Sequence, residues 1–175
     1  MMANVRKGKV TKAVCELRAR YGMRRMRFLN HVYDMEPGRF GINSSTRLTK
    51  EIRKAEMVSK VAIFTNTPNI WARRVVSRLG LDGTIKPGKL VTLERLDNAS
   101  YFKPSRRAFL KLFKVLRTRP GRIIFLDDSK DNIDEARKLG VESVLICNDG
   151  RCRLEGHSSS RTIYEELGTI ANSDK

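Results

Sequence analysis

Apolar residues recur at two different spacings along the chain, and the spacing changes near residue 60. From residue 10 to residue 56, apolar positions return every three or four residues, which is typical of helices with one buried face. Helices are expected at 10–21 and 23–33. A third should begin after a cap among residues 44–46, because Ser and Thr side chains accept a hydrogen bond from the first turn. The segment predicts a helical appendage packed beside the rest of the fold.

From residue 61 onward, short apolar runs alternate with helical stretches. Such runs are typical of strands buried on both faces, and their alternation with helices predicts an α/β fold with a parallel sheet. Strands are expected at 61–64, 90–93, 123–126 and 144–147, and helices at 69–79, from 104 onward, at 131–139 and at 162–170.

These patterns predict three parts of the chain. We expect a helical, cap-like region over residues 1–58 and an α/β core over residues 59–150. A stretch rich in Gly and Ser at 156–160 then leads to the last predicted helix. Residues 151–175 should therefore form a C-terminal tail with one short helix.

The chain is strongly basic, with 36 Lys and Arg against 19 Asp and Glu and a formal net charge of +17. The excess lies in residues 1–120, whereas residues 121–175 carry 8 basic and 11 acidic side chains. A field of this sign favours a polyanionic partner such as RNA or a ribonucleoprotein, although a merely solvated basic surface has the same composition. The candidate nucleic-acid contacts on the predicted helices are Arg24, Arg25, Arg27, Arg73, Arg74, Arg106, Arg107, Lys111 and Lys114.

Neither membrane insertion nor secretion is indicated. No apolar run approaches the roughly 18 residues that a spanning helix needs, so we expect no integral membrane protein. The cysteines, Cys15, Cys147 and Cys152, are odd in number and fit no disulfide framework or standard zinc pattern. No secretory apolar segment precedes them. We therefore expect a reducing intracellular compartment, either the cytoplasm or an organelle.

Polar side chains follow three of the predicted strands. Residues 65–67 (Thr-Asn-Thr) follow the first strand, Lys103 precedes the helix after the second, and residues 127–129 (Asp-Asp-Ser) follow the third. Each feature alone is also common as a helix cap or a surface lysine. Together, a hydroxyl, an ammonium and carboxylates at one rim of a parallel sheet predict a phosphate site with a place for Mg²⁺.

The same segments resemble a known family. The stretches IFTNTP, FKPSRRAF and IIFLDDSKDNIDEARKLGVESVLI resemble motifs II, III and IV of the haloacid dehalogenase superfamily of phosphohydrolases. Upstream, HVYDMEPGRFGINSSTRLTKEI is similar to the cap region of the pyrimidine 5′-nucleotidase branch. The resemblance covers about residues 20–148. It implies a Rossmann-type parallel sheet with a partial helical cap at the N-terminus, and hydrolysis of phosphate monoesters such as nucleotides.

The resemblance also implies roles for the residues of motifs II and III. Thr65 would hydrogen-bond the transferring phosphoryl group, with Asn66 beside it. Lys103 would neutralise the phosphate and the nucleophile. Thr65 and Lys103 are thus the implied catalytic residues, and Asn66 joins them in binding phosphate.

In motif IV, the resemblance implies a metal site. Asp127 would bind Mg²⁺, with Asp128 as a second ligand or an orienting group. Asp131 and Asn132 match variable positions behind this motif, and they are equally suited to capping the helix expected at 131–139.

The sequence departs from the family in its first motif, an apolar strand that ends in Asp-x-Asp and supplies the nucleophile. No Asp precedes Asp34, and Asp34-Met35-Glu36 follows no apolar strand. In the family this strand is central, so the gap must be filled by N-terminal residues or a partner chain, unless the sheet closes up or the sequence is a fragment. Two hypotheses follow: an incomplete nucleotidase-like phosphohydrolase, inactive as this chain alone, or a non-catalytic relative that serves as a basic RNA-binding or ribonucleoprotein subunit.

Overall fold

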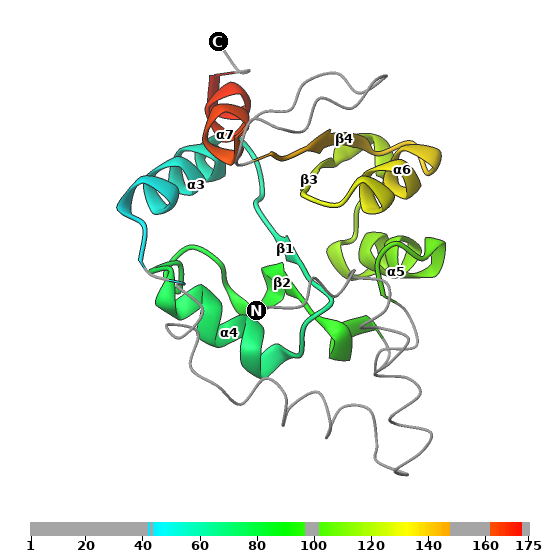
Figure 1. Ribbon diagram of the computed structural model, residues 1–175, viewed down its shortest axis with the longest axis horizontal. Helices are drawn as coiled ribbons and strands as arrows, with labels where there is room; N and C mark the ends of the chain where they lie inside the picture. The colour runs from blue at the N-terminus through cyan, green and yellow to red at the C-terminus, as the bar shows by residue number, and fades with distance from the viewer. Residues whose placement is uncertain (1–41, 43, 97–101, 148–161, 173–175) are drawn as a thin grey trace, which may run out of the picture.

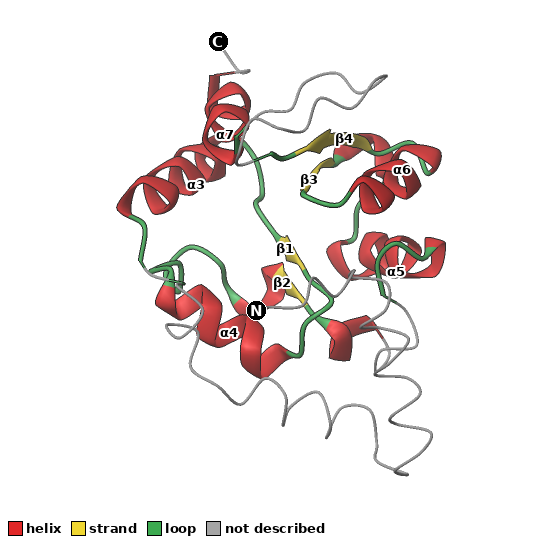
Figure 2. Ribbon diagram, in the orientation of Figure 1, coloured by secondary structure: helices red, strands yellow, loops and turns green. Residues whose placement is uncertain are grey.

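The computed structural model describes residues 42, 44–96, 102–147 and 162–172, in which helices surround two short pairs of strands (Figure 1 and Figure 2). The helices expected at 10–21 and 23–33 lie outside the described residues. The division of the chain into three parts stays a prediction.

The strands form two parallel pairs. β1 (Ile63–Phe64) lies beside β2 (Leu90–Val91), and β3 (Ile124–Asp127) lies beside β4 (Glu142–Leu145). A helix connects the two strands of each pair, as parallel strands require. The predicted α/β class and the parallel direction of the strands are therefore confirmed.

The helices α3 and α5 begin at side-chain caps. α3 (Thr46–Val58) begins after Ser45, whose hydroxyl accepts a hydrogen bond from the backbone N–H of Leu48 at 3.2 Å. This confirms a cap within residues 44–46. α5 (Arg106–Leu116) begins after Ser105, which caps it in the same way, two residues later than expected.

The remaining helices lie close to their predicted positions. α4 (Asn69–Arg78) and α6 (Lys130–Lys138) are followed by Gly80 and Gly140, whose φ angles of 73° and 78° favour glycine and end each helix. α7 (Ile163–Asn172) packs against α3 (Figure 1). Short 3-10 turns occupy Pro87–Lys89, Leu93–Leu96 and Pro120–Arg122.

The expected single sheet is not formed, and this is the main correction to the predicted fold. Within the described residues β1 pairs only with β2, and β3 pairs only with β4. Each of β1 and β3 therefore keeps one edge without a ladder partner. The prediction that all strand runs are buried is also wrong at Ala62, which is exposed and precedes β1, and at Ile124, which is 44% exposed in a sheet of only two strands. The other residues of the run at 61–64 are only partly buried.

Two apolar clusters lie on opposite sides of the strands. Ile63 of β1 and Leu126 of β3 pack with residues of α3, α4 and α7, whereas Phe64 and Phe125 pack with α5 and α6. Alternate strand residues thus serve different clusters, as the pleat of a strand requires. β1 and β3 belong to one layer even though their backbones are not paired.

Two observations concern the cysteines and membrane insertion. Cys147 is buried and disulfide-bonded, which the odd number of cysteines does not predict. A reducing compartment stays a prediction. Among the described residues, no helix is long and apolar enough to span a membrane.

Candidate functional site

Lys103 connects the ends of β1 and β3. Its ammonium Nζ donates a hydrogen bond to Asp127 Oδ2 at 2.6 Å and another to the backbone carbonyl of Phe64 at 2.9 Å. The side chains of Lys103 and Asp127 are only 9% and 8% exposed. The structure therefore brings together, at one end of the strands, two groups that are 24 residues apart in the sequence.

Asn66 holds the backbone of Lys103. Asn66 Oδ1 accepts a hydrogen bond from the Lys103 N–H at 2.8 Å, and Asn66 Nδ2 donates one to the Lys103 carbonyl at 2.9 Å. Both polar atoms of the Asn66 side chain thus have protein partners. This makes Asn66 a positioning residue for Lys103, a role that the sequence does not predict, while direct phosphate binding by Asn66 stays a prediction.

Three aromatic rings pack beneath the ammonium. Phe64, Phe109 and Phe125 meet with ring centroids 5.4 to 6.3 Å apart. Lys103 Nζ lies 5.0 Å from the Phe64 centroid and 5.4 Å from the Phe125 centroid, within the range of cation–π attraction. Phe64 and Phe125 therefore attract the ammonium, whose ion pair with Asp127 is largely buried.

Asp127 is held from its other side by the start of α6. Its Oδ1 accepts hydrogen bonds from the backbone N–H of Ser129 at 2.9 Å and from Asn132 Nδ2 at 2.8 Å. Asn132 is 9% exposed, so its amide faces the site rather than solvent. Asn132 lies in the first turn of α6, the helix that begins shortly after Asp127, and this spacing is the sequence signal for the contact. The sequence alone does not distinguish such a contact from a helix cap.

Thr65 directly follows Phe64 at the same strand end. Its backbone N–H donates to the Val91 carbonyl at 2.9 Å, which continues the β1–β2 pairing by one residue. Its hydroxyl lies 3.0 Å from the hydroxyl of Thr67 and accepts a bond from the Thr67 N–H at 3.2 Å. The turn therefore fixes the Thr65 oxygen, and its proposed contact with phosphate stays a prediction.

The described residues do not by themselves form a magnesium site. Mg²⁺ prefers six oxygen ligands in octahedral geometry. Asp127 already accepts three hydrogen bonds, and Asp128 is exposed beside it. Within the described part of the chain, no group of three acidic, histidine or cysteine side chains is placed to hold a metal. Metal binding by Asp127 and Asp128 stays a prediction.

The basic residues named as nucleic-acid candidates are spread over two regions. Arg24, Arg25 and Arg27 lie outside the described residues. Arg73 and Arg74 lie on α4, whereas Arg106, Arg107, Lys111 and Lys114 lie on α5. The two helices lie on opposite sides of β1 and β2 (Figure 1), and nucleic-acid binding by these residues stays a prediction.

Comparison with known proteins identifies a family and a relative that this chain resembles. Residues 10–140 match the haloacid dehalogenase-like hydrolase family. A phosphorylated carbohydrates phosphatase from Thermotoga maritima is 26% identical over 129 residues, which cover 71% of this chain and 57% of that protein. The chain thus spans less than two thirds of this relative's length. Because the family match includes most of the chain and all residues of the Lys103–Asp127 site, this protein belongs to the haloacid dehalogenase-like hydrolase family.

Proposed function

We propose that this chain carries the phosphate-binding part of a phosphohydrolase site for phosphate monoesters, related to that of pyrimidine 5′-nucleotidases. The observation that carries the proposal is the buried Lys103 ammonium, held between the ends of β1 and β3 and paired with Asp127. Such a preorganised cation stabilises the negative charge of a phosphoryl group. The phosphatase relative from Thermotoga maritima is consistent with this class of substrate.

The protein residues divide the task between binding and positioning. The Lys103 ammonium donates to the phosphate dianion and offsets part of its charge, and the Thr65 hydroxyl donates to one of its oxygens. Asn66 holds the backbone of Lys103, and Asn132 fixes the orientation of the Asp127 carboxylate. In the unbound protein Lys103 is neutralised by Asp127, so an arriving phosphate shares the ammonium with that carboxylate.

The 175 residues contain no motif that would supply the nucleophile of a covalent route. Covalent phosphoryl transfer in this family needs a carboxylate that attacks phosphorus, and no Asp-x-Asp triplet occurs in the 175 residues. Haloacid dehalogenase-like hydrolases generally use Mg²⁺, but the described residues hold no group of three acidic, histidine or cysteine side chains placed to bind it. We therefore expect this chain alone to bind phosphate and to leave phosphate monoesters intact.

The free strand edges suggest where the missing carboxylate belongs. β1 and β3 lie in one layer, and each has a ladder partner on one side only within the described residues. An apolar strand placed between them and ending in Asp-x-Asp would bring its carboxylates beside Lys103 and Asp127. Such a strand supplies both the nucleophile and the oxygen atoms that a magnesium site lacks.

The test separates binding from hydrolysis. Calorimetric titration with inorganic phosphate should detect binding that Lys103→Gln weakens by about 10- to 100-fold, as expected for a hydrogen bond to a charged group. Thr65→Val should weaken binding less and leaves the ion pair intact, so it serves if Lys103→Gln does not fold. Lys60→Gln removes an exposed cation and should have no effect. Equal binding by all four proteins would refute the proposal.

Hydrolysis of uridine monophosphate with Mg²⁺ should stay at background for the chain alone. Adding a peptide with an apolar strand that ends in Asp-x-Asp should produce activity, and the matched peptide with both Asp changed to Asn should not. Mg²⁺-dependent activity of the chain alone that Asp34→Asn abolishes would show that the nucleophile is already present.

A further inference from the structure

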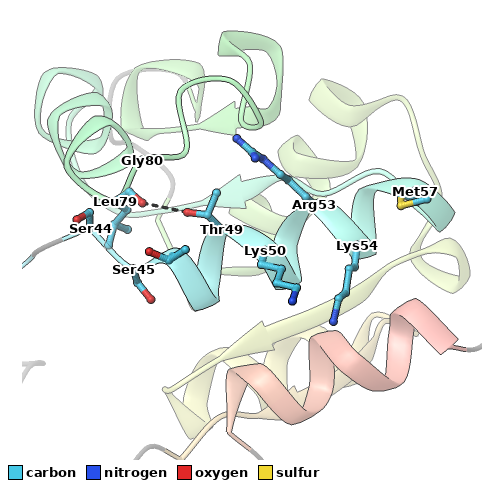
Figure 3. Close-up of a pocket in the computed structure, with 10 residues that line it drawn as sticks. Ser44, Ser45, Thr49, Lys50, Arg53, Lys54, Met57, Leu79 and Gly80 are labelled. Atoms are coloured by element: carbon cyan, nitrogen blue, oxygen red, sulfur yellow. Dashed lines mark hydrogen bonds between the residues drawn. The ribbon is translucent and has the colours of Figure 1, made fainter.

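A groove of about 590 Å³ runs along α3, on a different part of the molecule from Lys103. One stripe of α3 lines it at helical spacing, from Thr46 through Lys50 and Arg53 to Met57. These positions span about 16 Å along the helix axis. Leu79 and Gly80, just after α4, complete the wall (Figure 3). The groove therefore extends along the helix and is open to solvent, unlike a closed pocket for one small ion.

Cations of α3 line this groove. Figure 3 shows Arg53 pointing to one side of α3, and Lys50 and Lys54 pointing to the other. Lys54 is paired with Glu51 on the same helix. Lys50 and Arg53 are exposed and have no acidic partner within the described residues. Two positive charges without an acidic partner among the described residues therefore line the groove.

The acids of α3 do not offset these charges. Glu51 is paired with Lys54, and Glu56 is paired with Lys89, which lies just before β2. Thr49 donates its hydroxyl hydrogen to the Leu79 carbonyl, which fixes the helix against the opposite wall (Figure 3). This hydrogen bond joins the two walls of the groove, and the charged lining residues that lack an ion-pair partner among the described residues, Lys50 and Arg53, are both positive.

The apolar residues that line the groove restrict which class of ligand can bind there. Met57 is 85% exposed at one end of the groove, and Leu79 contributes an apolar surface at the other. A ligand that matches this surface carries both negative charges and apolar flat faces. Nucleotide units have this combination, because phosphates contact Lys and Arg while bases and sugars cover apolar side chains. The net charge of +17 adds long-range attraction for a polyanion.

We propose that the α3 groove binds single-stranded nucleic acid, with Lys50 and Arg53 contacting phosphates and Met57 contacting a base or sugar. None of these three residues is among the nucleic-acid candidates that the sequence suggests. The site is separate from the phosphate site at Lys103, so either function can exist without the other.

The experiment measures binding of a fluorescein-labelled oligouridylate of about 12 nucleotides by anisotropy, with salt varied from about 50 to about 200 mM. The unmodified protein should bind with a clear negative salt slope. In Lys50→Gln/Arg53→Gln, the slope should flatten by about 1.4, so that the loss of affinity over this salt range is about sevenfold smaller. Lys50→Arg should retain the slope, because it keeps the charge.

The matched control is Arg106→Gln/Lys114→Gln, which removes two exposed cations from α5, the basic surface suggested by the sequence. It should leave the slope close to that of the unmodified protein. All variants should unfold within about 2 °C of the unmodified protein, because exposed substitutions change stability by less than about 0.5 kcal/mol.

Several results would overturn the proposal. One is a salt slope near zero in the unmodified protein, and another is equal flattening by the α3 and α5 variants. Displacement of the oligonucleotide by uridine monophosphate at equal nucleotide concentration would show that no strand is recognised. Tighter binding to phosphatidylserine vesicles, lost in the Lys50→Gln/Arg53→Gln variant, would assign the groove to an anionic membrane surface instead.

Discussion

The strand-end site and the α3 groove both use cations, but their surroundings differ. Lys103 is buried, paired with Asp127 and packed on aromatic rings. Lys50 and Arg53 are exposed and have no acidic partner within the described residues. A buried cation must be compensated within the protein, so its removal affects folding as well as function. An exposed cation is compensated by water, so it is free to attract a ligand at little cost to stability.

The largest effect is expected from breaking the buried pair. Asp127→Asn removes the negative charge and leaves the Lys103 ammonium buried without compensation. The free energy of unfolding should fall by about 3–5 kcal/mol, which lowers the melting temperature by roughly 6–20 °C. Thermal and urea unfolding measure this change.

The matched control for that change is Asp134→Asn, which removes the acid from a far more exposed pair with Lys130. Its loss should cost no more than about 1 kcal/mol. Similar losses for both variants would mean that water, rather than Asp127, compensates the charge of Lys103. The buried and the exposed ion pairs would then contribute equally to stability.

The next effect concerns the positioning of Lys103. Asn66→Ala removes both hydrogen bonds to the Lys103 backbone. We expect a loss of about 1–3 kcal/mol in the free energy of unfolding and a weaker affinity for inorganic phosphate, because the ammonium is no longer fixed. Asn69→Ala, at an exposed position of α4, should change neither measurement. Unchanged phosphate affinity in Asn66→Ala would show that Lys103 is positioned by its ion pair alone.

A smaller effect is expected at the beginning of α3. Ser45→Ala removes the side-chain oxygen that accepts the Leu48 N–H. The loss should be about 1 kcal/mol, as for other helix caps. Thr46→Ala, one position later, removes a hydroxyl that caps nothing and should cost less. An equal loss for the two variants in urea unfolding would indicate that the cap does not determine where α3 begins.

Features set by neighbouring residues were the most predictable from the sequence. A cap among residues 44–46 and glycines at positions 80 and 140 mark helix ends through short-range geometry. The polar residues at strand ends were predictable for a similar reason, because parallel strands direct their carboxyl ends to one rim. Both kinds of inference need only local spacing and a fold class.

Contacts between distant segments were not predictable from the sequence. Asn66 and Lys103 are 37 residues apart, and nothing in either residue type indicates that a side-chain amide pairs with a backbone. The bounds of β4 show a related limit. In the apolar run at 144–147 the last three residues are buried, but the strand stops at Leu145. Burial determines the apolar pattern, whereas backbone pairing determines the strand.

The smallest expected effect is a gain in stability rather than a loss, and it concerns the two exposed cations of the α3 groove. Lys50→Gln/Arg53→Gln removes two unpaired positive charges from a protein with a net charge of +17. Since these charges repel the others, their removal should raise the free energy of unfolding slightly, by up to about 0.5 kcal/mol. The gain should be largest at low salt and disappear near 1 M salt, where the Debye length is about 3 Å. Urea unfolding at low and high salt measures this difference. A loss of stability that persists at high salt would mean that Lys50 and Arg53 support the fold, and the groove would then resemble the strand-end site rather than contrast with it.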